Sequence, residues 1–158
     1  MLLKLRQLFD REGDKKDIYL DIPNDELGEL SGVGTFLTPI SLRGDIKNRA
    51  GIVETDCVLS VTLRRICDRC LNEFNREYNI PVKHTLIRGA DGADGFEPAV
   101  LDDNEYIVCD NDTLDVNELA IQDLLLSLPT KTLCREDCKG LCPVCGQDLN
   151  LGGCDCNV

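Results

Sequence analysis

Hydrophobic and polar residues alternate over much of the first two thirds of the chain, which is the pattern of half-buried β-strands. The clearest example is residues 52–66, where one face carries Val53, Thr55, Cys57, Leu59, Val61 and Leu63. Pro39 suggests an edge or a bulge in the preceding segment, and Pro81 interrupts a later one. The pattern predicts five strands, over residues 17–22, 36–46, 52–66, 73–88 and 105–110.

These segments follow one another through short turns without intervening helices, which favours an antiparallel meander or a partly closed barrel over a parallel sheet. One main helix is predicted near 114–128. Thr113 or Asp115 can cap its start, Glu118 lies in its first turn and Pro129 marks its end. The apolar residues at helical spacing are Leu119, Leu124, Leu125 and Leu128. The fold class is therefore α+β, with one main C-terminal helix.

Composition limits the kind of protein this is. The 158 residues fit one domain with room for a small appendage, and 29 acidic residues against 17 basic ones give a net charge of −12. Such a chain repels polyanions at long range unless its cations are segregated. No apolar run approaches the ~20 residues of a membrane span, and the first residues lack a signal-peptide core. We expect a cytoplasmic protein with no membrane partner.

The charges are divided along the chain. Residues 89–130 contain no lysine or arginine, and residues 91–118 hold ten acidic side chains. Residues 62–88 instead carry six cations against three acids. Two interpretations stay open: the charges solvate opposite faces, or one side of the molecule contacts RNA while the other contacts a basic protein.

Ten cysteines are the strongest chemical signal. Disulfides are a poor explanation, because nothing directs secretion and such short loops would restrain little of the chain. Eight of the cysteines form four couples, which we number in chain order: Cys67/Cys70, Cys134/Cys138, Cys142/Cys145 and Cys154/Cys156. Eight thiols make two tetrahedral zinc sites, and the proline and glycine of CPVCG shape a typical zinc knuckle. We therefore expect zinc as the cofactor, with two ions.

Chain length favours one way of pairing the couples, although the other pairings stay open. Joining the second couple to the third requires a reversal within residues 139–141, whereas eight residues separate the third from the fourth. We expect the third and fourth couples to share one site and the first and second to share the other. This predicts a β-rich domain over 1–130 and a zinc-binding, cysteine-rich tail over 131–158 that is clasped to the 67–70 hairpin.

The remaining candidates give no support for catalysis. Cys57 lies on the apolar face of its strand and Cys109 follows Ile107 and Val108, so both are interpreted as small core residues. His84 is the only histidine and has no acid partner that the sequence identifies, so general-base chemistry is not expected. Zinc sites filled by four thiolates leave no open position for water. The sequence therefore predicts no enzyme and no small-molecule substrate.

Several motifs in order resemble the YceD-like family, a domain of unknown function linked to accumulation of large-subunit ribosomal RNA. They are RRICDRCLNEF after the strands, an acidic segment, the helix DVNELAIQDLLLSLP and CREDCKGLCPVCGQDLN. The resemblance covers most of the chain, from about residue 17 to residue 156. Members occur in bacteria and plastids, and the CxxC of the first couple is the family's most typical motif. The resemblance implies a role in ribosome biogenesis.

Two classes of function therefore compete. In the first, the chain binds large-subunit (23S) ribosomal RNA, its precursor or a basic ribosomal protein, with candidate phosphate contacts at Arg64, Arg65, Arg69 and Arg76. In the second, it is unrelated to ribosomes and serves as a zinc-stabilised protein-interaction module or a thiol redox sensor. A CxxC can cycle as a dithiol. However, no thioredoxin-like βαβ pattern surrounds this one.

Overall fold

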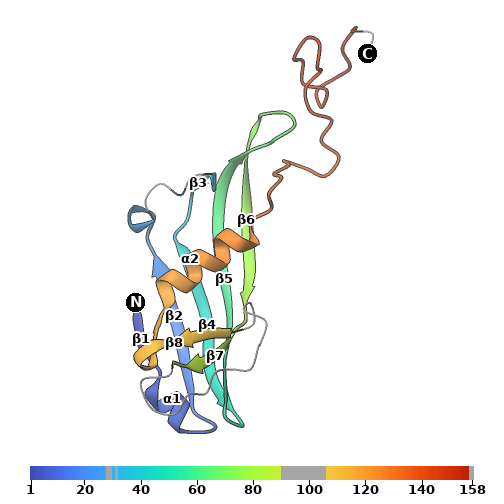
Figure 1. The fold of residues 1–158 in the computed structure, drawn as a ribbon. Coiled ribbons are helices and arrows are strands. Elements are labelled where there is room, and N and C mark those ends of the chain that lie inside the picture. Colours follow the sequence, from blue (N-terminus) through green and yellow to red (C-terminus); the bar gives the residue numbers. More distant parts are fainter. Residues whose placement is uncertain (28–29, 31, 90–105, 157–158) are drawn as a thin grey trace.

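The structure is a computed structural model that describes residues 1–27, 30, 32–89 and 106–156. Most of its strands belong to one sheet, and the main helix lies across one face of that sheet (Figure 1). The elements are β1 (Leu2–Lys4), α1 (Arg6–Asp10), β2 (Lys15–Ile22), η1 (Asn24–Glu26), β3 (Thr35–Phe36), β4 (Ile40–Arg49), β5 (Ile52–Ile66), β6 (Glu73–Val82), β7 (Thr85–Arg88), β8 (Tyr106–Cys109), η2 (Asp110–Asp112), β9 (Thr113–Asp115) and α2 (Val116–Ser127).

The main sheet is open and mostly antiparallel. Among the described residues its strands follow the path β2-β4-β5-β7-β8, and β3 and β6 also pair with β5. Of the described strand pairs, only β7 and β8 run parallel to each other. The predicted antiparallel meander is therefore confirmed. The described sheet does not close, so the alternative prediction of a partly closed barrel is wrong.

Strand β5 organises the sheet and has the predicted bounds. Its side chains alternate between buried and more exposed, and the buried set is the predicted face from Val53 to Leu63. Long apolar side chains on this face are fully buried, including Leu59 and Leu63. Each such burial stabilises the fold by about 1.5–3 kcal/mol. The strand therefore specifies both the sheet and its core.

Two predicted strands are interrupted in the structure. The segment predicted over 36–46 divides into β3 and β4, with Pro39 between them. The segment predicted over 73–88 divides at Lys83 and His84 rather than at Pro81, which lies inside β6. Proline is tolerated there because β6 pairs only with β5 in the described sheet. At the break, the His84 N–H donates to Thr55 Oγ1 over 2.8 Å.

Helix α2 supplies the second layer of the core. Asp115 caps it by accepting hydrogen bonds from the backbone N–H groups of Asn117 and Glu118. Its buried residues are Val116, Leu119, Ala120 and Leu124. Leu125 is 43% exposed, so its predicted place on the apolar face is wrong. The helix ends at Ser127, two residues before Pro129.

The chain after α2 leaves the sheet and continues past the tip of the β5–β6 hairpin (Figure 1). Six of the ten residues in the predicted acidic segment, Asp91 to Glu105, lie outside the described residues. The elements β1, α1 and β9 have three to five residues each and were not predicted. Such lengths are too short to show a hydrophobic period.

Candidate metal centres

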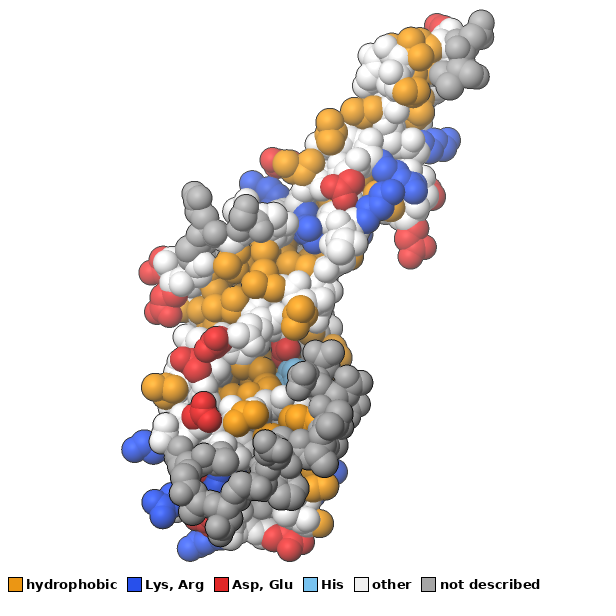
Figure 2. Space-filling view, viewed as in Figure 1, with side chains coloured by type: hydrophobic (Ala, Val, Ile, Leu, Met, Phe, Trp, Pro, Cys, Tyr) orange, Lys and Arg blue, Asp and Glu red, His pale blue; other side chains and the backbone are white. Residues whose placement is uncertain are grey.

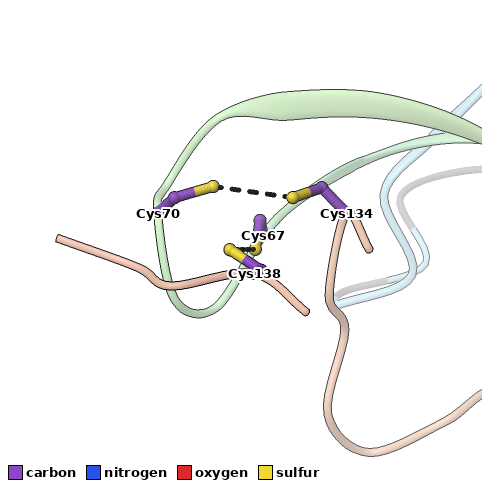
Figure 3. A group of neighbouring side chains, drawn as sticks. All are labelled: Cys67, Cys70, Cys134 and Cys138. Atoms are coloured by element: carbon purple, nitrogen blue, oxygen red, sulfur yellow. Dashed lines mark hydrogen bonds between the residues drawn. The ribbon is translucent and has the colours of Figure 1, made fainter. Parts of the chain in front are cut away.

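The first group of thiols lies where the hairpin meets the tail. Cys67 and Cys70 come from the turn between β5 and β6, and Cys134 and Cys138 come from the chain after α2 (Figure 3). Their four sulfur atoms all lie within 4.8 Å of one another. We call this group the inner cluster. It brings together the first and second couples, although they are separated by more than 60 residues.

The sulfur spacing fits a tetrahedral metal site. The Sγ atoms of Cys67 and Cys138 are 3.7 Å apart, as are those of Cys70 and Cys134. A zinc ion with Zn–S bonds of about 2.3 Å places its tetrahedral sulfur ligands about 3.8 Å apart. These two separations therefore match those of a tetrahedral zinc site with four thiolate ligands.

The protonation chemistry of these thiols also indicates a need for a cation. Burial opposes ionisation of Cys67, but backbone N–H groups of Cys70, Cys134 and Arg69 bring the pKa of this thiol down to about 6. Burial and then the neighbouring thiols of Cys70 and Cys138 raise the pKa of Cys134 to about 12. Four thiolates this close repel one another, so a bound cation is required for all four to be ionised together.

Polar contacts attach the tail to the hairpin around the inner cluster. The backbone N–H of Asp68 donates to the Thr132 carbonyl over 2.8 Å, and the Asp68 carboxylate accepts from the Thr132 N–H. The guanidinium of Arg69 donates to the Cys138 carbonyl over 2.8 Å. That of Arg76 donates to the Leu133 carbonyl, also over 2.8 Å. The tail segment is therefore docked by backbone groups as well as by thiols.

The second group, Cys142, Cys145, Cys154 and Cys156, lies further along the tail, and we call it the outer cluster. Its sulfur atoms are also within 4.8 Å of one another. Backbone N–H groups of Cys145 and Val144 lower the pKa of Cys142 to about 6. The Cys145 thiol, followed by burial, raises the pKa of Cys156 to about 11. Cys145 is exposed, whereas three thiols of the inner cluster are buried.

The outer cluster is also joined to the hairpin. The Leu141 N–H donates to the Arg69 carbonyl over 3.1 Å. The Asn72 amide donates to Asp148 over 2.7 Å. Gly140 lies in this junction with a φ of +78°, and an added β-carbon would be 3.0 Å from the Arg69 carbonyl oxygen. These contacts fix residues 140–150 beside the hairpin turn.

The structure distributes the four predicted RNA-contacting arginines unevenly. Arg69 and Arg76 use their guanidinium groups to hold the tail, and Arg76 also stacks over the Phe74 ring at 5.1 Å. Arg65 is half-buried and donates weakly to the Tyr78 hydroxyl over 3.5 Å. Arg64 is exposed near the end of β5. Arg64 is therefore the member of the set best placed to meet a phosphate.

The two remaining cysteines and the histidine are part of the folded core or of contacts that hold it together. Burial, reinforced by nearby aspartates, raises the pKa of both Cys57 and Cys109 to about 11. Both are core residues, as predicted. The expectation that His84 lacks an acid partner is wrong, because Asp123 of α2 lies 2.8 Å from its Nε2 atom. Asp123 comes from an element whose position the sequence does not specify, and the pair links α2 to the sheet.

The open antiparallel sheet, the single long helix and the two four-cysteine clusters define a β-rich protein with two candidate metal sites. The chain belongs to the family described as large ribosomal RNA subunit accumulation protein YceD, whose family model matches residues 55–158. The match includes β5 from its fourth residue onward, the hairpin turn, α2 and all eight clustered cysteines. The family name links the chain to accumulation of large-subunit ribosomal RNA.

Similar curated proteins include the uncharacterized proteins Mb2951c of Mycobacterium bovis and Rv2926c of Mycobacterium tuberculosis. Each is 29% identical to this chain over 99 residues, which is 63% of the chain. The matched region covers 45% of each relative, so the chain spans less than half of their length. No solved structure matches. None of the helices in the described part of the chain is long and apolar enough to cross a membrane.

Proposed function

We propose that the chain is a non-enzymatic, cytoplasmic factor of ribosome biogenesis that supports accumulation or processing of large-subunit (23S) ribosomal RNA. It acts by binding the RNA precursor or a basic ribosomal protein. The observation that carries this proposal is the family match over 55–158, since it contains the hairpin and both cysteine clusters. The cluster end is therefore the part that this function would use.

Both clusters hold zinc in this proposal. Each offers four sulfur donors within 4.8 Å, and this soft, all-thiolate donor set is typical of structural zinc. Cys67, Cys70, Cys134 and Cys138 would hold one ion, and the outer cluster would hold the other. A zinc ion with four protein ligands supplies structure and no reactive water. The residues around it then act by positioning a binding surface.

RNA contact would depend on a small number of cations. The chain is strongly acidic, and Arg69 and Arg76 are occupied with the tail. Arg64 is exposed and lies three residues before the first cysteine of the inner cluster. Binding through so few phosphate contacts must be weak and sensitive to salt.

Purified protein tests this proposal when it is titrated with transcripts of large-subunit ribosomal RNA and, separately, with proteins extracted from large ribosomal subunits. Binding to at least one of the two above background supports it. For RNA, Arg64→Gln should lower the affinity for every RNA sequence to a similar extent. It should also reduce the slope of log affinity against log salt concentration by about 1. Arg6→Gln is the control, because Arg6 is 82% exposed on α1, away from the clusters. Background binding to both probes at low salt would refute the proposal.

A further inference from the structure

Leu71 has an unusual backbone conformation immediately after the second cysteine of the hairpin. Its φ is +60°, in the left-handed region that side chains with a β-carbon disfavour. The residue at the same place in the outer cluster, after Cys145, is Gly146 with a φ of +74°. The two turns therefore have the same shape, but one uses glycine and the other uses leucine.

The leucine side chain does not compensate for this strain within the chain. Leu71 is 63% exposed, and neither hydrophobic cluster of the described residues includes it. Glycine would fit the conformation more easily and would give up little buried surface. A residue that strains the backbone and leaves its apolar side chain in water indicates that the side chain contacts another molecule.

Other exposed aliphatic side chains occur at the same end of the molecule. Ile66 directly precedes Cys67 and is 58% exposed, and Val144 and Leu151 of the tail are 68% and 88% exposed. The tail is held to the hairpin beside Leu71 through the bond from Asn72 to Asp148. We call Ile66, Leu71, Val144 and Leu151 the apolar tip. Figure 2 shows hydrophobic side chains along this projecting end.

We propose that the apolar tip docks into an apolar pocket on a basic protein, with Leu71 as the inserted side chain. The four side chains are aliphatic, and the neighbouring Phe74 ring is covered by Arg76. The tip therefore offers no open aromatic ring for stacking on a nucleic-acid base, although such rings are a usual part of single-strand binding sites.

Charge also favours a basic protein over RNA at this end. Residues 64–76 and 131–156 contain seven cations and six acids. Each four-thiolate zinc site adds a charge of −2, so the end becomes net negative when both sites are filled. The whole chain carries −12. A cationic partner is attracted to such a surface, whereas a polyanion is repelled. The inference rests on the proposed function and selects a basic ribosomal protein as the partner.

The test compares the full-length, zinc-loaded protein with Leu71→Gly and with the control Val58→Thr, which changes an apolar residue of β5 that is 47% exposed. The probes are the protein fraction extracted from purified large ribosomal subunits and a large-subunit ribosomal RNA transcript. Leu71→Gly should weaken binding to the ribosomal proteins by about tenfold or more, as expected for one inserted leucine. Its Tm should be unchanged or higher, and Val58→Thr should bind as the parent does.

The outcomes separate this inference from the proposed function. If Leu71→Gly binds the ribosomal proteins as tightly as the parent, the docking inference fails while the proposed function stands. If Leu71→Gly loses affinity for the RNA alone, the tip is an RNA wedge and protein docking is refuted. A Leu71→Gly Tm several degrees below the parent would show that the leucine is structural. If the parent binds neither probe, both proposals fail.

Discussion

Substituting Cys70 and Cys145 one at a time should have different consequences, because the two clusters join different parts of the chain. Cys70→Ser removes a ligand from the inner cluster, which connects the hairpin to a segment 64 residues away. Cys145→Ser removes a ligand from the outer cluster, whose members all lie within the tail, after α2. Loss of the inner site should therefore destabilise the sheet, and loss of the outer site should not.

The expected size of this difference follows from the loop that each site closes. In the chain-entropy description of cross-links, a loop of about 64 residues contributes about 4 kcal/mol to the free energy of unfolding. Domains of this size have about 5–15 kcal/mol in total. Cys70→Ser should thus lower the Tm of the sheet by about 8–16 °C. The outer site restrains only the tail, so Cys145→Ser should change the Tm of the sheet by less than about 2 °C.

The Tm of each variant is measured by following the circular dichroism signal of the β-sheet on heating. Elemental analysis of the same samples gives the zinc content per chain. The parent should contain about two zinc ions per chain, and each variant should contain about one. Equal Tm losses in the two variants would refute the assignment of the inner site as the clasp. Zinc-free parent protein with an unchanged Tm would refute the role of metal in folding.

Three further predictions concern single residues. Asp115→Ala should lower the free energy of unfolding by about 1 kcal/mol through loss of the α2 cap. Burial raises the pKa of Asp115, but the Met1 amino group and the backbone N–H groups that it caps hold this pKa below its ordinary value. The difference should therefore be fully present above about pH 4 and disappear as pH falls through that lowered pKa, as chemical denaturation across pH can show. Gly140→Ala should speed hydrogen exchange of the backbone amides around the outer cluster without changing the Tm of the sheet, because its β-carbon would crowd Arg69. An unchanged exchange rate would contradict this. The buried thiols of Cys57 and Cys109, with pKa values of about 11, should not react with a thiol reagent near pH 8 until the protein unfolds, and rapid reaction of the native protein would show that they are accessible.

The sequence predicts the sheet well where hydrophobic periodicity is long. In β5 the alternation persists for fifteen residues, so the bounds and the buried face agree with the structure. Periodicity does not predict β1, α1 or β9, which are too short, or the parallel pairing of β7 with β8. That pairing joins two strands of four residues each, and their hydrophobic pattern does not specify which strands they pair with.

The thiol clusters were predictable because their spacing is local within each couple. Turn geometry fixes the couples, and the short connection between the third and fourth favours the observed grouping. The contacts of Arg69, Arg76 and Asp68 were not predictable, because they join backbone groups more than 55 residues away. The sequence therefore did not show that two of the arginines predicted to contact phosphate also hold the tail.

Profiling ribosomal RNA in a strain depleted of this protein tests the central claim most directly. Factors that support large-subunit RNA should change the ratio of mature large-subunit RNA to small-subunit RNA when they are removed. The account predicts that this ratio falls, that large-subunit precursors accumulate, and that the parent chain restores the ratio while Cys70→Ser does not. An unchanged ratio and precursor profile after complete depletion would contradict the account.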